Sequence, residues 1–286
     1  MRIKLFLWTF FTICAMSCSV LEDDVSEVDN GYKTFYAVLE QPSSQETKVF
    51  VNEDLRLRWD DDDRIAIFDK NTYAAQHKYV GGDGESTGEF EKISTGGFVT
   101  GNSLDIVCAV YPYLSDKPKI NNAGSVVTLT LPNTQTYRAG SFGLGANTMI
   151  STGEDDKLAF KNVCGYLALK LYGDNASVSS ITLTGNDGEY LSGKAEVKVA
   201  LGEVPSLQTF TSGTDFIKLE CKNPVKVGST ADNATIFWIV VPPTKFEKGF
   251  TVTVEYNDGD EFVQTTSRSI EIKRSCLTRM AAFKVD

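Results

Sequence analysis

The chain has 286 residues, and its 38 acidic side chains outnumber its 28 basic ones, which gives a net charge of −10. An acidic surface of this size disfavours binding to nucleic acid or to anionic lipid headgroups. The length suits two folded domains, and the content of aromatic residues, 11%, excludes a chain that is disordered throughout.

Residues 1–17 are predicted to form an export signal. Two basic residues, Arg2 and Lys4, precede an apolar run from Leu5 to Ala15, and small residues lead up to Cys18. The apolar run is about half of the roughly 20 residues that a membrane-spanning helix needs. A cysteine directly after the cleavage position of a bacterial signal can be acylated, for example with palmitate, so Cys18 is the predicted lipidation site. The alternative is an ordinary secretory signal with a chance cysteine.

Residues 18–31 are predicted to form an acidic tether. They contain no basic residue and the acidic residues Glu22, Asp23, Asp24, Glu27 and Asp29. Such a segment buries too little apolar surface to order itself. With a lipid on Cys18, the tether would display the rest of the chain on the cell surface, at the outer membrane.

From residue 32 onward the sequence predicts an all-β fold, because apolar residues alternate and are interrupted by Gly, Asn and Asp turns, without helical periodicity. The predicted strands of the first half cover residues 34–39, 48–51, 55–59, 65–68, 71–80, 90–93, 104–111 and 126–131. Those of the second half cover residues 158–160, 166–171, 181–184, 195–200, 216–219, 234–241, 250–256, 262–266, 269–272 and 281–285. Roughly seven strands in each half are what a β-sandwich needs.

Residues 133–156 contain few strand-forming side chains, and we predict that they are the longest irregular stretch. The boundary between two β-sandwich domains is therefore placed there, with domains at residues 32–156 and 157–286. Two tight hairpins are also predicted. One lies at residues 181–190, around Asn186-Asp187-Gly188, and the other at residues 250–266, because these turn sequences tolerate the positive φ angles of a tight turn.

The sequence offers little material for catalysis. The single histidine, His77, excludes a multi-histidine metal site, and its neighbours alternate as on an exposed strand face, so we expect it to be solvated. Four consecutive carboxylates at Asp60–Asp63 could bind Ca²⁺, but successive residues of an extended chain point to opposite faces, which favours an acidic turn. A pair of glycosidase carboxylates has no local spacing and stays open. We therefore predict no enzyme activity, no cofactor and no metal.

The cysteines beyond the signal are Cys108, Cys164, Cys221 and Cys276. Four cysteines of an exported chain could form two disulfides in any of three pairings. Because Cys108 and Cys164 lie in apolar strand patterns, free buried thiols are the favoured interpretation.

Several short motifs together resemble a known family. They are Phe35-Tyr36-Ala37, Leu57-Arg58-Trp59 leading through Asp62-Asp63 to Ile65-Ala66-Ile67-Phe68, Ala109-Val110-Tyr111-Pro112-Tyr113, Leu131-Pro132-Asn133-Thr134-Gln135, residues 158–167, Val240-Val241-Pro242-Pro243 and residues 281–285. In this order they are similar to the fimbrillin-like (major fimbrial subunit-like) lipoproteins of Bacteroidota, which build type V pili. The resemblance implies two transthyretin-like β-sandwich domains in tandem.

The resemblance also implies a function. The chain would be a fimbrial subunit, or an accessory or tip adhesin, whose partners are other fimbrial subunits and a host or bacterial surface ligand. In this family an arginine-specific protease removes the first strand of shaft subunits, and a C-terminal strand of the next subunit fills the groove. No Arg lies between Cys18 and Arg56 here, so an anchor, tip or accessory role is at least as consistent as a shaft role.

By this resemblance, residues 34–39 would be the displaced strand, and residues 281–285 the donor. The sequence ends immediately after that donor, so we expect the subunit to accept a strand more readily than it gives one. The alternative function is a glycan-binding surface lipoprotein of a polysaccharide-uptake system. Such a protein would present exposed aromatic rings, whereas Trp59 and Trp238 lie in apolar strands where burial is expected.

Overall fold

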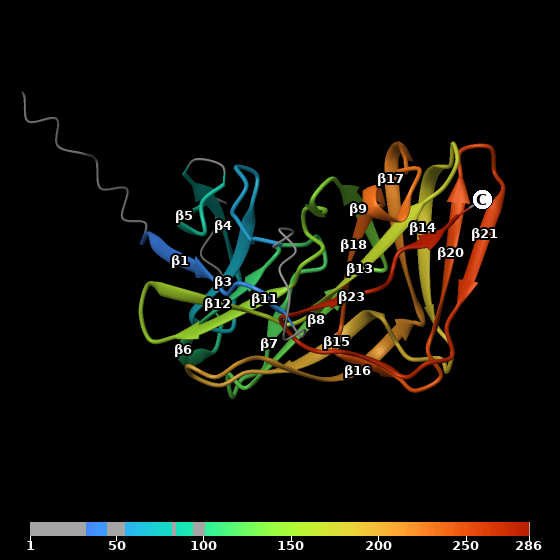
Figure 1. Cartoon of the computed structure of the whole chain (residues 1–286). Coiled ribbons are helices and arrows are strands. Elements are labelled where there is room, and N and C mark those ends of the chain that lie inside the picture. Colours follow the sequence, from blue (N-terminus) through green and yellow to red (C-terminus); the bar gives the residue numbers. More distant parts are fainter. Residues whose placement is uncertain (1–32, 45–54, 82–83, 94–100, 286) are drawn as a thin grey trace, which may run out of the picture. The chain divides into compact units, whose positions relative to one another are not determined.

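The alternating pattern forms an all-β fold, as the sequence predicts (Figure 1). The computed structural model describes residues 33–44, 55–81, 84–93 and 101–285. The signal, Cys18, the acidic tether and the predicted strand at residues 48–51 lie outside these residues. Within them the only helical element is the 3-10 turn η1 (Ala231–Asn233), and no helix is long and apolar enough to span a membrane.

The first group of strands closes into a barrel. In order around it lie β1 (Phe35–Leu39), β12 (Lys157–Asn162), β11 (Met149–Gly153), β6 (Ser103–Tyr111), β3 (Arg64–Asn71), β4 (Ala75–Val80) and β5 (Thr87–Lys92). Strand β1 completes the closure, since it pairs in parallel with β12 and antiparallel with β5.

The remaining strands form further sheets. One contains β10 (Ser141–Phe142), β9 (Thr134–Arg138), β17 (Phe216–Lys226), β14 (Ser177–Gly185), β20 (Phe250–Tyr256) and β21 (Glu261–Thr265). A second contains β18 (Thr235–Val241), β13 (Gly165–Tyr172), β23 (Cys276–Arg279) and β2 (Ser43–Ser44), with β24 (Phe283–Lys284) also on β13. A third contains β16 (Ser206–Thr214), β15 (Ser192–Lys198), β8 (Val126–Leu131) and β7 (Lys119–Ile120), and β19 (Thr244–Phe246) pairs with β22 (Ile270–Ile272).

Strands β13 and β18 bury both of their faces. Along β18, Trp238 and Val240 belong to one hydrophobic core, whereas Phe237 and Ile239 belong to a second. The same alternation holds in the paired strand β13. This is why the two strands read as nearly continuous apolar runs rather than as alternating ones.

The split into domains at residues 156 and 157 stays a prediction. Several strand pairings join segments on either side of that position. Strand β12, which begins at Lys157, pairs with β1 and β11, and β15 pairs with β8.

The prediction of an irregular stretch at residues 133–156 is wrong, because β9, β10 and β11 lie within it. The buried side chain of Gln135 explains part of this order. Its Nε2 donates to the carbonyl oxygen of Val240 at 2.7 Å, and the Val240 N–H donates to its Oε1 at 3.0 Å. Gln135 thus supplies β18 with the hydrogen bonds of a missing neighbour strand, which hydrophobic periodicity does not reveal.

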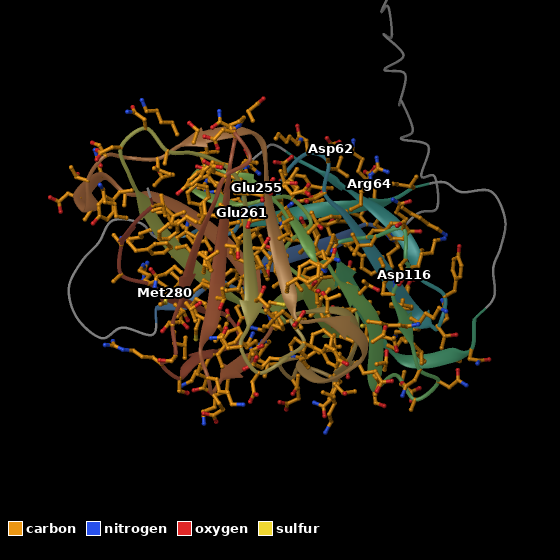
Figure 2. All side chains as sticks on the ribbon, turned by 90° about the vertical axis from the view of Figure 1, so that its right-hand side faces the viewer. Asp62, Arg64, Asp116, Glu255, Glu261 and Met280 are labelled. Atoms are coloured by element: carbon orange, nitrogen blue, oxygen red, sulfur yellow. The ribbon has the colours of Figure 1, made fainter. Side chains whose placement is uncertain are left out.

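The hairpin predicted at residues 181–190 is also wrong. The chain does turn at Asn186 and Asp187, but β14 pairs with β17 and β20, whereas β15 joins β8 and β16 in another sheet. The second hairpin is confirmed, since β20 pairs with β21. Figure 2 shows its labelled residues Glu255 and Glu261, which are directly opposed, and the ammonium group of Lys218 lies 3.5 Å from Glu255.

The four cysteines of the described residues are free thiols, as favoured from the sequence. Cys108 and Cys164 are fully buried, and burial raises the pKa of each to about 12. They therefore act as small apolar side chains.

Replacing Gln135 by Leu tests its role as a strand substitute. The substitution keeps an apolar stem but leaves a buried N–H and C=O of Val240 without partners, so the free energy of unfolding should fall by about 3 kcal/mol. Urea denaturation measures this change. The matched control is Gln208→Leu, because Gln208 is exposed and, among the described residues, its side chain bonds to Ser206 alone. Equal losses in both variants would contradict the role.

Candidate functional site

Strand β1 fills a slot in the barrel wall. Its side chains Phe35, Ala37 and Leu39 are only 1%, 4% and 6% exposed, whereas Tyr36 and Val38 are 49% and 44% exposed. Its backbone is paired with β12 on one edge and with β5 on the other. A slot with two hydrogen-bonding edges and a row of apolar pockets is the geometry that accepts an added strand.

The predicted solvent exposure of His77 is wrong, because the side chain is only 3% exposed and lies under β1. The Phe35 ring meets the imidazole edge-on, with centroids 5.2 Å apart. Burial lowers the pKa of His77 to about 4, although the Ala75 carbonyl and Asp69 oppose this shift. His77 shares the inward face of β4 with Tyr79, so a neutral histidine takes the place of an apolar residue.

An ion pair fixes the chain just after β1. The guanidinium of Arg274 donates to both carboxylate oxygens of Glu40, from Nη1 at 2.6 Å and from Nη2 at 3.0 Å. Nη1 also donates to the carbonyl of Asn162, whose N–H donates to Glu40. Burial acts to raise the pKa of Glu40, but the hydrogen bonds from Arg274 and Asn162 hold it below its usual value. We call these residues, Glu40, Asn162 and Arg274, the clamp.

The clamp was not foreseen from the sequence, since 234 positions separate Glu40 and Arg274. Beyond it, β2 pairs in parallel with β23, with Ser43 opposite Cys276. The segment that follows β1 is therefore attached to strands from the end of the chain.

A glutamine side chain secures the next segment as well. Gln41 Nε2 donates to the Leu57 carbonyl at 3.1 Å, and the Leu57 N–H donates to Gln41 Oε1 at 2.9 Å. The strand predicted at residues 55–59 is only partly confirmed. Its side chains alternate between buried and exposed as expected, but its backbone hydrogen bonds go to the Gln41 side chain and to the loop residues Gly84 and Glu85 instead of to a neighbouring strand.

The Asp60–Asp63 stretch forms a turn, as predicted from the sequence. Asp63 points inward, accepting a hydrogen bond from the Tyr111 hydroxyl at 2.7 Å and another from the Asp60 N–H at 2.8 Å. Burial raises the pKa of Asp63 to about 6 against the effect of these bonds. Asp62 faces solvent (Figure 2). No cluster of the described residues could hold a metal ion.

Trp59 and Trp238 are buried, as expected, with exposed fractions of 2% and 3%. Four aromatic rings surround Trp59, namely those of Tyr79, Phe90, Tyr111 and Phe160. Neither indole therefore offers the exposed platform by which a surface glycan binder would be recognised.

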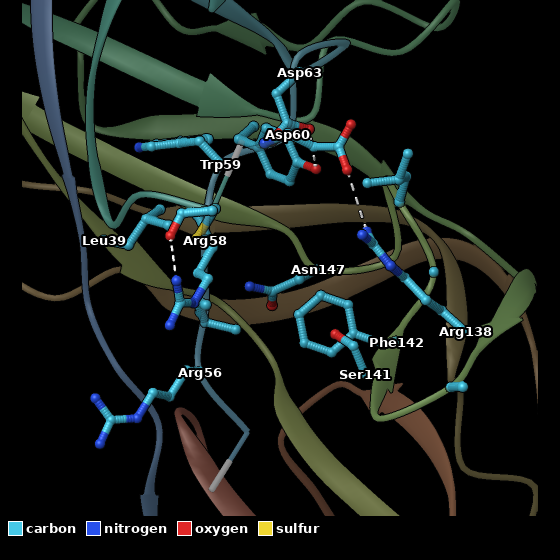
Figure 3. A pocket seen from close by; sticks show the side chains of 17 residues that line it. Leu39, Arg56, Arg58, Trp59, Asp60, Asp63, Arg138, Ser141, Phe142 and Asn147 are labelled. Carbon is cyan, nitrogen blue, oxygen red and sulfur yellow. Dashed lines mark hydrogen bonds and ion pairs between the residues drawn. The ribbon is translucent and has the colours of Figure 1, made fainter. Parts of the chain in front are cut away.

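A cavity of about 380 Å³ lies beside this turn, and Leu39 at the end of β1 forms part of its wall (Figure 3). Its polar and charged lining residues are Arg56, Arg58, Asp60, Asp63, Tyr111, Arg138, Ser141 and Asn147. Its apolar lining residues are Leu39, Leu57, Trp59, Ala139, Phe142, Leu144 and Met149.

The C-terminal strand is engaged within the fold. Only Phe283 and Lys284 of the predicted strand at residues 281–285 pair, in parallel with β13. Val285 is fully buried and Phe283 partly so, but Ala281 is exposed. The expected apolar spacing is therefore only partly realised.

No protein-family model matches the chain, and neither does any curated protein sequence. Among solved structures, a candidate cell adhesion protein from Bacteroides ovatus aligns over 88% of this chain and 93% of its own, at 14% identity and a TM-score of 0.48. A second, from Bacteroides uniformis, aligns over 89% and 95%, at 14% identity and a TM-score of 0.44. The tip fimbrial protein Mfa3 from Porphyromonas gingivalis aligns over 86% and 94%, at 9% identity and a TM-score of 0.31.

Two of these solved structures are thus of candidate cell adhesion proteins, and the third is of a tip fimbrial protein. Each TM-score lies below 0.5, so these likenesses by themselves assign no role to the chain.

The burial of His77 predicts a specific pH dependence. The pKa of His77 is near 4 in the folded chain, below the usual 6.5 of a free histidine. As the pH falls from 6.5 toward 4, the unfolded chain takes up a proton on His77 and the folded chain does not. The folded state therefore loses stability over this range, whereas above pH 6.5 the burial of His77 carries no such loss. Between pH 7 and pH 4.5 the free energy of unfolding should fall by about 2 kcal/mol more in the natural chain than in His77→Phe.

Asp63 has the opposite effect, because its raised pKa favours the folded state as the pH falls through 6. Asp63 is present in both the natural chain and His77→Phe, so its effect cancels when their stabilities are compared. Denaturant titrations at several pH values give the difference. Parallel stability curves would show that His77 is not held neutral beneath β1.

Proposed function

We propose that the chain is a fimbrial subunit, or an accessory or tip adhesin, that assembles by strand exchange at the slot of β1. The observation that carries the proposal is β1 itself, a five-residue strand paired on both edges, with alternate side chains in the barrel core. The ordered motifs shared with fimbrillin-like proteins support the same conclusion.

Removing β1 would leave apolar pockets and backbone hydrogen-bonding groups of the barrel without partners. Burial of Phe35 and Leu39 stabilises the fold by about 1.5–3 kcal/mol each. Without β1, the facing edges of β5 and β12 would also lose their backbone partners. A strand from another subunit can restore both the hydrogen bonds and the apolar contacts.

The subunit is proposed to accept a strand rather than to donate one. Strand β24 pairs with β13, and Val285 lies fully within the second core. Donation would empty that position and break the pairing, whereas acceptance at the slot requires only that β1 and the clamp be released.

The wider organisation belongs to the same proposal. The chain would carry a lipid on Cys18 after removal of residues 1–17, and residues 18–31 would link this anchor to two tandem transthyretin-like domains at residues 32–156 and 157–286. Its place would be the outer surface of the outer membrane or a fimbrium, with other fimbrial subunits and a host or bacterial surface ligand as partners.

Strand acceptance is tested with a chain that lacks residues 19–48. This chain should bind a peptide of residues 33–44, and it should also bind the C-terminal strand of a partner fimbrial subunit. The control peptide carries Phe35→Asp and Leu39→Asp, and its affinity should be at least about 100-fold lower because two apolar pockets stay unfilled. If the shortened chain is folded by circular dichroism yet binds neither strand, the proposal fails.

Lipid anchoring is tested with Cys18→Ala in cells. The Cys18 thiol is the group proposed to carry the lipid and alanine lacks it, so the variant should move from the membrane fraction to the soluble fraction. Fractionation and mass spectrometry of the N-terminus measure both events. A processed variant that stays in the membrane fraction would disprove Cys18 as the anchor.

A further inference from the structure

The clamp holds an acidic side chain of the same segment that fills the slot. Glu40 follows Leu39 directly, and its N–H donates to the Phe160 carbonyl at 3.0 Å, so the pairing with β12 continues through this residue. Its carboxylate accepts two hydrogen bonds from Arg274 and one from the Asn162 N–H. The segment therefore presents a fixed order of groups to the barrel, namely three alternating apolar side chains and then a carboxylate.

The groups that receive this carboxylate are held in place by contacts that do not involve β1. Arg274 Nη1 donates to the Asn162 carbonyl oxygen at 2.9 Å. The Asn162 side chain donates to Ser275 Oγ at 2.9 Å and accepts from Asn147 Nδ2 at 2.9 Å. The Tyr166 hydroxyl in turn donates to Asn147. The receiving site is thus preorganised, and a carboxylate that replaces the one of Glu40 meets donors that are already oriented.

Loss of Glu40 leaves these donors without a partner. Asn162 is fully buried, and the Arg274 side chain is only 26% exposed, so water replaces the carboxylate poorly. A partly buried charge without its partner is unfavourable, and a strand with a neutral residue at this position leaves it in that state. The site therefore favours a strand that brings its own negative charge.

The same order of residue types occurs a second time in the sequence. Residues 281–286 (AAFKVD) repeat the order of residues 35–40 (FYAVLE), with an apolar residue at every second position and then an acidic residue. Residues 281–285 are the segment that the family resemblance implies as a donor. An acidic residue after the apolar pattern is thus a feature that a donated strand of this type can carry.

We propose that the clamp selects the partner strand, because Arg274 and Asn162 bind a carboxylate that directly follows the third apolar residue of a strand entering the slot. The partner is a subunit whose donated strand runs in the direction of β1 and carries Glu or Asp at that position. This proposal rests on the proposed strand exchange and adds a charge preference to its apolar pattern. A strand with Lys or Arg at the position would place a like charge against Arg274, so the clamp also discriminates against such strands.

The test uses the full chain with a protease recognition sequence inserted between residues 48 and 49. Cleavage in the folded state keeps every residue present but allows the segment that carries β1 to exchange with an added peptide. A labelled peptide of residues 33–44 is followed by fluorescence anisotropy and compared with its Glu40→Gln and Glu40→Lys forms. The natural peptide should bind at least about tenfold more tightly than the Glu40→Gln form, because a bidentate charge-assisted contact is lost. The Glu40→Lys form should bind more weakly still.

Substitutions in the chain assign this preference to the clamp. With Arg274→Gln, the natural and Glu40→Gln peptides should bind equally. The matched control is Lys273→Gln, which removes an exposed positive charge next to Arg274 and should keep the preference. Equal affinities of the two peptides for the natural chain would overturn the proposal and leave strand exchange standing, as would an equal loss of preference in both variants. If no peptide binds, strand exchange fails, and the proposal fails with it.

A double-mutant cycle in the uncut chain gives a second measurement that does not depend on the cut chain staying folded. Urea denaturation of Glu40→Gln, of Arg274→Gln and of the double variant yields the coupling between the two side chains. This coupling should correspond to at least about a tenfold change in the unfolding equilibrium constant. Additive effects would show that the carboxylate gains nothing from Arg274, which would overturn the proposal.

Discussion

The fold depends on one sheet whose two faces lie in two different hydrophobic cores. Neighbouring residues of β18, such as Phe237 and Trp238, belong to different cores, so a single strand contributes to both. Neither core can form its full set of contacts until β13 and β18 are paired. Folding of the two halves is thereby coupled, even where their outer strands form separate sheets.

The clamp extends this coupling to strand β1. Arg274 lies next to β23, which pairs with β13, and its partner Glu40 follows β1 directly. Bidentate geometry and partial burial make this ion pair stronger than a typical surface pair, which contributes about 0–1 kcal/mol. Release of β1 thus requires separation from β5 and β12 and also loss of a contact with the C-terminal strands. The strand is thus held by two kinds of interaction, the backbone pairing of β1 and the ion pair of the clamp.

The sequence predicts those parts of the fold in which periodicity decides the structure. Strands β1, β8 and β20 alternate cleanly, since one face is buried and the other is not, and all three were predicted. Strand β9 was missed because Gln135 stabilises it through a side-chain bond to a distant strand. The sequence predicted His77 to be exposed, because in an alternating pattern a polar residue on an inward face cannot be distinguished from one that faces solvent. The clamp could not be predicted, as its ion pair joins residues from opposite ends of the chain.

Two residues of β1 point away from the barrel, so the strand has an inward face and an outward face whose side chains can vary independently. Phe35, Ala37 and Leu39 are recognised by the slot, whereas Tyr36 and Val38 face solvent. Under the proposed strand exchange, any strand that carries the first pattern can occupy the position, whatever it carries at the second. Substitutions at the outward positions can therefore change the epitope that an antibody meets at that point of the surface while the contacts of the strand with the barrel core stay the same.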